Sequence, residues 1–145
     1  MLPRWHIFLG AAFTLAFAAI LPDTHWIYLT LIFLSSFLID FDHYMAGARK
    51  SKTFNLTKVL RYHDLMLLQE KRENERGIRR RGDFHIFHTL EFHIIVALLG
   101  FVWVGFWYIL IGMVFHSLLD IISLLYGDRL YRREYFFFAW LAKNI

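Results

Sequence analysis

Long apolar runs alternate with short polar segments along most of the chain, and this pattern predicts four membrane-spanning helices. The predicted spans are residues 5–21, 26–44, 85–104 and 106–126. An α-helix rises about 1.5 Å per residue, so about 20 apolar residues cross a hydrocarbon core of about 30 Å. Residues 26–39 are too few for this, and the second helix must continue through Tyr44 to cross. The acidic residues near its end are therefore drawn towards the membrane boundary.

The third and fourth spans are predicted to form a hairpin. As one helix, residues 84–126 would measure about 64 Å, roughly twice the thickness of the hydrocarbon core. We therefore expect two helices folded at Gly100–Gly105, with Trp103, Trp107 and Tyr108 in an aromatic belt at the far interface.

The distribution of positive charge supports four spans and sets their orientation. With four spans, Arg4, the basic loop at residues 45–83 and the basic tail after Tyr126 share one side of the membrane. An excess of Lys and Arg marks the cytoplasmic side. We therefore expect both termini in the cytoplasm and a multi-pass protein of the inner (cytoplasmic) membrane. The aromatic segment Tyr135–Leu141 is expected to lie along the membrane surface.

The N-terminal segment has a second possible interpretation. Arg4 followed by the apolar run Ile7–Leu21, with Ala16 and Ala18 as small residues, also fits a secretory signal peptide. Because the apolar run continues past Ala18, we expect a spanning helix.

The loop at residues 45–83 has eleven Lys and Arg residues and five Asp and Glu residues. Its apolar residues recur at helical spacing, namely Leu56, Val59, Leu60, Leu67 and Leu68. With a cap at Asn55, this spacing predicts an amphipathic helix in the membrane interface, on which His63 is an interfacial residue. From charge alone, we expect the run Arg79, Arg80 and Arg81 to hold an anionic head group.

Composition supports a single all-α membrane domain over residues 1–145. The chain is 58% hydrophobic and 19% aromatic, with a mean hydropathy of +0.43, which is too apolar for an ordinary soluble domain. The formal net charge of +4 is concentrated in the loop, where it suits anionic lipid better than nucleic acid. The chain has no cysteine, which excludes disulfides, thiolate metal sites and cysteine nucleophiles.

Ionisable residues interrupt every predicted span, and in the four-span topology all of them fall in the cytoplasmic half. The candidate metal ligands are His6, Asp40, Asp42, His43, His88, His93, His116 and Asp120. Glu91 lies among them, and the sequence leaves open whether His85 joins them. Polar residues at one depth of a helix bundle predict a shared pocket.

Spacing indicates which of these residues act together. His116 and Asp120 are four residues apart and share a helix face, as two ligands of one ion should. His88 and His93 are five apart, so His88 is expected at or before the helix start, or at a different ion. Imidazole and carboxylate ligands without thiolate suit Zn²⁺, and also Mn²⁺ or Fe²⁺. About eight ligands would serve two or three ions.

Each residue also has a simpler interpretation. Asp40 and Asp42 could sit in water at a helix end, His6 could be an interfacial residue, and His116 with Asp120 could be a buried pair between helices. Taken together, however, four carboxylates in one low-dielectric region would cost about 10 kcal/mol without compensation. Bound cations would offset this cost.

The motif order resembles a known family. His6, then Asp40-x-Asp42-His43 after a span, His88-x4-His93 at the next hairpin and His116-x3-Asp120 in the last helix are similar to the YdjM-like inner-membrane metal-dependent hydrolases. That family is similar in motif order to the zinc-dependent phospholipase C and nuclease group. The resemblance implies metal-assisted hydrolysis of a lipid phosphoester, with Asp42 or Glu91 accepting a proton.

Two other functions fit some of the pattern. A metal transport or sensing protein would also hold ions, but an ion path should continue through the outer half of the bundle, where few ionisable residues occur. A histidine-box oxygenase would be expected to show adjacent histidine pairs, and the chain has none.

Overall fold

The computed structural model describes residues 3–145, which are helical with no strand. The helices are α1 (Pro3–Ile20), α2 (Trp26–Leu38), α3 (Phe41–Ser51), α4 (Leu56–Glu75), α5 (Leu90–Leu99), α6 (Gly105–Tyr126) and α7 (Phe137–Asn144). Short 3₁₀ turns occupy Ile86–His88 and Leu130–Arg132. The prediction of an all-α fold is confirmed.

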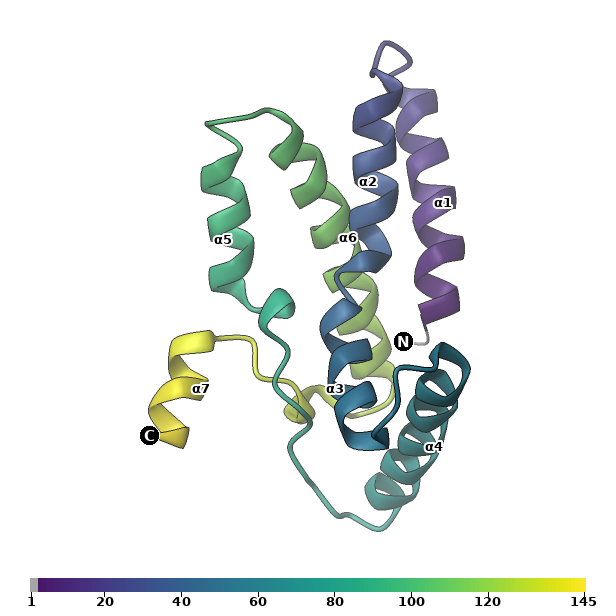
Figure 1. The fold of residues 1–145 in the computed structure, drawn as a ribbon, viewed down its shortest axis with the longest axis vertical. Helices are drawn as coiled ribbons and strands as arrows, with labels where there is room; N and C mark the ends of the chain where they lie inside the picture. The colour runs from purple at the N-terminus through teal and green to yellow at the C-terminus, as the bar shows by residue number, and fades with distance from the viewer. Residues whose placement is uncertain (1–2) are drawn as a thin grey trace.

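Two helical hairpins form the body of the molecule, α1 with α2 and α5 with α6 (Figure 1). Their tight loops, at residues 21–25 and 100–104, both lie at the upper end of the view. Helix α6 packs against α2, α1 and α5. The lower ends of the hairpins therefore meet α3, α4 and the C-terminal segment, as the alternating directions of the predicted spans require.

Small residues allow α6, α2 and α1 to pack closely. A Cβ atom added at Gly112 of α6 would overlap Ser35 Oγ and the carbonyl oxygen of Ile32 in α2, and one at Gly10 of α1 would overlap Ser36 Oγ. Such contacts are typical of helices in membranes, where association depends on close packing because lipid is as apolar as the side chains. This contact holds α6, which carries His116 and Asp120, against α2, which leads into the bend at Asp40.

The second predicted span, residues 26–44, is divided by a bend. The N–H of Asp40 donates to the carbonyl of Phe37 at 3.1 Å, a tighter 3₁₀-type bond, and the N–H of Tyr44 then donates to the carbonyl of Asp40 at 3.0 Å to start α3. The helical stretch continues through Tyr44 as predicted, but it bends at Asp40 instead of running straight. The bend lies at Asp40, one of the predicted metal ligands, just before Asp42 and His43.

Two helical stretches are long and apolar enough to cross a membrane, Trp26–Ser51 with its bend and Gly105–Tyr126. Helices α1 and α5 are apolar but shorter. The ten residues of α5 rise about 15 Å, half of a hydrocarbon core, because residues 85–89 form a 3₁₀ turn and extended chain in place of the predicted helix start. The hairpin fold is as expected, and the four-span arrangement stays a prediction.

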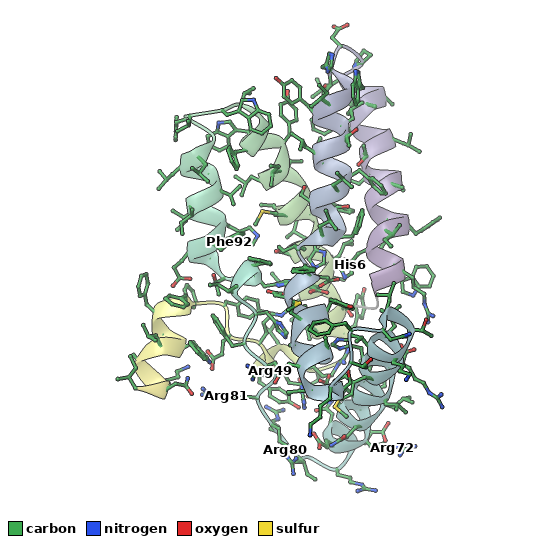
Figure 2. All side chains as sticks on the ribbon, in the orientation of Figure 1. His6, Arg49, Arg72, Arg80, Arg81 and Phe92 are labelled. Atoms are coloured by element: carbon green, nitrogen blue, oxygen red, sulfur yellow. The ribbon has the colours of Figure 1, made fainter. Side chains whose placement is uncertain are left out.

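The basic loop folds as predicted around its amphipathic helix. The Asn55 side chain accepts the N–H of Lys58 at 3.1 Å and caps α4, whose Val59 is fully buried against α3. His63 packs on α3 through Gly47, and its Nε2 lies 3.0 Å from the carbonyl oxygen of His43. Figure 2 shows arginines such as Arg72 and Arg80 gathered at the end of the molecule away from the hairpin loops.

Candidate metal centre

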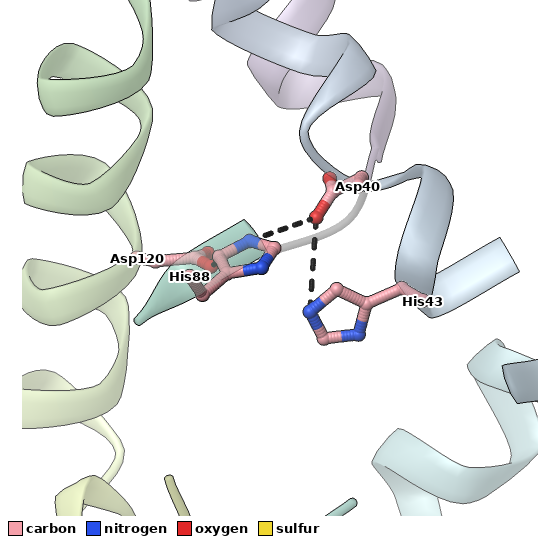
Figure 3. A group of neighbouring side chains, drawn as sticks. All are labelled: Asp40, His43, His88 and Asp120. Atoms are coloured by element: carbon pink, nitrogen blue, oxygen red, sulfur yellow. Dashed lines mark ion pairs between the residues drawn. The ribbon is translucent and has the colours of Figure 1, made fainter. Parts of the chain in front are cut away.

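Imidazoles and carboxylates from five parts of the chain meet where the two hairpins join α3. The cluster consists of His6 from α1, Asp40 from the bend, Asp42 and His43 from the first turn of α3, His85 and His88 from the segment before α5, and His116 and Asp120 from α6. Figure 3 shows four of these side chains converging from separate elements. The predicted convergence of scattered His and Asp residues is confirmed, and His85 joins the cluster.

Four donor atoms, which we call the tetrahedron, have spacings that suit the ligands of one small ion. His88 Nε2 and His116 Nε2 are 3.1 Å apart, and they lie 3.5 and 3.4 Å from Asp40 Oδ1. Asp120 Oδ2 lies 3.5 Å from His116 Nε2 and 3.9 Å from His88 Nε2. Bonds of about 2.0–2.1 Å to a tetrahedral ion place its ligands about 3.3 Å apart. Four of these five distances are therefore close to the size expected around one small divalent ion, and the fifth, from Asp120 to His88, is longer.

Hydrogen bonds orient both histidines for metal binding. His116 Nδ1 lies 2.8 Å from the carbonyl oxygen of Ser36, which can only accept, so this nitrogen donates and Nε2 keeps its lone pair. His88 Nδ1 lies 3.3 Å from Asp42 Oδ2 and donates to it in the same way. Two Nε2 lone pairs therefore face each other, as they do when both bind one cation.

His6 is fully buried beside this tetrahedron. Its ring stacks on His116 with centroids 3.9 Å apart, and its Nε2 lies 3.2 Å from Asp120 Oδ1. Neither ring nitrogen has a hydrogen bond to any residue within 3–145. Because an unsatisfied buried polar group is costly, His6 is a further candidate metal ligand, and its donor atom lies within 4.8 Å of those of Asp40 and His116.

A further group, Asp42, His43 and His85, lies towards α3. The rings of His43 and His85 stack with centroids 3.5 Å apart, and His85 Nδ1 lies 3.7 Å from Asp42 Oδ1. Burial lowers the pKa of His85, which precedes α5, to about 4. Its imidazole is therefore neutral at pH 7, which is the form that binds metal.

One residue of the cluster was not predicted from the sequence. Arg133, from the segment between α6 and α7, donates to Asp120 Oδ2 at 2.6 Å and to His43 Nε2 at 3.1 Å. No spacing relates it to the histidines, because the tail reaches the site only by folding back. The sequence placed it merely among the basic residues of the cytoplasmic tail.

Two predicted site residues lie outside the cluster. The ring of His93 lies 2.9 Å from the carbonyl oxygen of Thr89 and 3.1 Å from Ser117 Oγ, so both of its nitrogens are engaged elsewhere. The Glu91 carboxylate accepts the N–H groups of Phe137 and Phe138 at 2.9 and 3.3 Å, and thus caps α7. The structure assigns both side chains to helix packing and capping. His88 does precede the helix start, as its distance from His93 in sequence predicted.

A cavity of about 500 Å³ opens beside the cluster, between α3, α4 and the C-terminal segment. Asp40, His43, Asp120 and Arg133 are among the residues that line it. Arg80 and Arg81 also line it, although Arg80 pairs with Glu73 at 3.6 Å and Arg81 with Glu134 at 2.7 Å. Arg79 does not line it and pairs with Asp128 at 3.4 Å.

The placement of His93 gives a direct test of the cluster. His93→Ala is expected to keep the full metal content of the wild type, because its nitrogens bond to Thr89 and Ser117. Glu91→Gln is expected to behave likewise, since the amide oxygen still accepts one N–H of α7. Metal content per chain, measured by inductively coupled plasma mass spectrometry, checks both. Loss of metal in His93→Ala would show that His93 is a metal ligand after all.

Comparison of the chain with protein-family models, with curated proteins and with solved structures finds no match. The function is therefore argued from the geometry of the site.

Proposed function

We propose that this protein is a membrane-embedded, metal-dependent hydrolase that cleaves a phosphoester of a lipid or lipid-linked substrate at the cytoplasmic face. The observation that carries the proposal is the tetrahedron of His88 Nε2, His116 Nε2, Asp40 Oδ1 and Asp120 Oδ2. Two imidazoles and two carboxylates, oriented by hydrogen bonds on their far sides, match the ligand chemistry and spacing of Zn²⁺.

The surroundings of the tetrahedron support a catalytic role over a purely structural one. A further histidine donor adjoins it at His6, which allows for a second ion. Clustered divalent ions, when bound, activate water and polarise phosphoryl oxygens. A structural zinc site is closed by its four ligands, whereas this one adjoins a cavity.

Asp42 is suited to accept a proton. Its Oδ2 already accepts the N–H of Phe87 at 3.1 Å and the Nδ1–H of His88. Its Oδ1 is buried and makes no hydrogen bond to the described part of the chain. A carboxylate held on one oxygen and free on the other is fixed in place and still has an acceptor site for a proton.

The shape and lining of the cavity support an anionic amphipathic substrate. Its lining includes the basic residues Lys50, Arg129 and Arg132, each paired with an acidic residue of the same lining, and apolar residues such as Phe37 and Leu60. Large apolar side chains are exposed on the outer faces of the hairpins, which favours a lipid environment for the molecule. A lipid phosphate would place its head group at the ions and its chains against the apolar residues of the lining.

The proposal is tested on the full chain purified in mild detergent. After incubation with Zn²⁺ or Mn²⁺ and removal of excess metal, we expect at least about one tightly bound ion per chain and hydrolysis of phospholipid or lipid-phosphate substrates in mixed micelles. Fewer than one ion per chain together with no phosphoester turnover would contradict the proposal. Metal flux into proteoliposomes without turnover would support the transport alternative instead.

A further inference from the structure

The position of Arg133 carries an inference that deepens the proposed function and rests on it. Its side chain is only 12% exposed, although it comes from a connecting segment and not from a helix of the bundle. Its guanidinium is shared between Asp120 Oδ2 at 2.6 Å and His43 Nε2 at 3.1 Å. A fixed positive charge thus lies within the ligand cluster.

The contact with His43 indicates that the guanidinium takes the place of a metal ion. Arginine has donors and no acceptor, so His43 Nε2 must accept through its lone pair. The same lone pair would be needed to bind a metal ion. While Arg133 is in place, a cation therefore occupies the side of the cluster next to His43, and that cation is a guanidinium.

The backbone around Arg133 is anchored on both sides. The carbonyl oxygen of Arg132 accepts the N–H of Gly82 at 2.8 Å, at a close approach where a Cβ atom on Gly82 would come within 2.9 Å of that oxygen. The carbonyl oxygen of Tyr135 accepts the N–H of Leu90 at 2.9 Å. Arg133 is therefore held against the segment that carries His85 and His88, and its placement is built into the fold.

The remaining donors of Arg133 are available to a ligand. The two contacts use two of the five N–H groups of the guanidinium, whose planar fork matches two oxygens of a phosphoryl group. Arg133 lines the cavity together with Asp40 and Asp120, so a group in the cavity can reach both the guanidinium and the metal ligands.

We propose that Arg133 binds the phosphoryl group of the substrate, serving as the positive charge that a second metal ion would provide beside His43. The ligand chemistry is a phosphate mono- or diester anion. Free phosphate and a lipid head group share this chemistry, and the apolar residues of the cavity lining, such as Phe37 and Leu60, should make the lipid bind more tightly.

The experiment measures binding by isothermal titration calorimetry in neutral detergent, with inorganic phosphate and with dihexanoyl phosphatidic acid as separate probes. Arg133→Gln is expected to weaken both by about 10- to 100-fold, the loss of a charge-assisted fork, with an unchanged zinc content. Arg133→Lys is expected to recover part of the affinity. Arg49→Gln removes an exposed cation outside the cavity and should bind as the wild type does.

Each result bears on one proposal or the other. Wild-type affinity for both probes in Arg133→Gln, or no binding of either probe by the wild type, overturns the role of Arg133. A fall in zinc content in the same variant also overturns it, by showing that the residue supports the ligand set. Binding is measured with and without zinc. The affinities of the wild type and Arg133→Gln can therefore be compared even if the wild type holds no ion. Absence of zinc and of turnover in the wild type contradicts the hydrolase itself.

Discussion

Replacing His116 by alanine is expected to abolish tight metal binding and phosphoester hydrolysis together. His116 Nε2 takes part in three of the tetrahedral edges, to His88, Asp40 and Asp120. Loss of an outer-sphere partner alone typically costs 10- to 100-fold in metal affinity, so loss of this ligand should cost at least about 100-fold. Metal content and zinc titration measure the first effect, and turnover of a lipid phosphoester the second.

Stability gives an independent measurement of the same loss. Zinc at about 100 times its Kd should stabilise the wild type by about 2.7 kcal/mol, because it binds only the folded state. The variant should show no such gain. Asp120→Asn keeps the shape of the side chain and removes its charge. We expect zinc to stabilise this variant less than the wild type as well.

The matched control is His25→Ala, which removes an exposed histidine from the opposite end of the bundle, where it caps α2. It should keep both the metal content and the zinc-dependent stability of the wild type. Full zinc stabilisation in His116→Ala would contradict the assignment of the tetrahedron, whatever the activity of the variant.

Local sequence patterns predicted the parts of the site that depend on local structure. The spacing of His116 and Asp120 predicts one helix face, and both reach the cluster from α6. The cap at Asn55 and the hairpin at Gly100–Gly105 are likewise short-range features that the structure confirms. Alternating spans then bring the polar ends together, so the existence of a cluster could be inferred before its geometry was known.

The residues whose positions differ from the prediction depend on structural features that local sequence patterns do not show. A 3₁₀ turn at Ile86–His88 and a cap at Thr89 start α5 at Leu90, and this register directs His93 towards Ser117. The bend after Leu38 breaks a run that reads as one helix. Arg133 arrives through a connecting segment whose path depends on contacts with residues far away in the chain, such as Gly82.

Gly112 links the packing of the bundle to the geometry of the metal centre. Its Cα hydrogen faces the carbonyl oxygen of Ile32 and Ser35 Oγ across the contact with α2. Ser35 cannot easily move away, because its hydroxyl donates to the carbonyl of Leu31 at 2.7 Å. One residue further along α2, the carbonyl of Ser36 accepts the Nδ1–H of His116 at 2.8 Å. A shift of α2 therefore reorients a metal ligand.

Substituting Gly112 by alanine and by valine is expected to destabilise the fold in that order and to weaken metal binding. Alanine gains about 1 kcal/mol in helix propensity, but the overlap involves a backbone oxygen, and overpacking costs typically about 1–3 kcal/mol. The net effect should be destabilising for alanine and larger for valine. Unfolding in detergent and zinc titration measure the two effects. Val114→Ile adds one carbon to an exposed position of the same helix and should leave both unchanged, whereas a Gly112→Ala variant as stable and as zinc-avid as the wild type would show that α2 and α6 need no glycine at their contact.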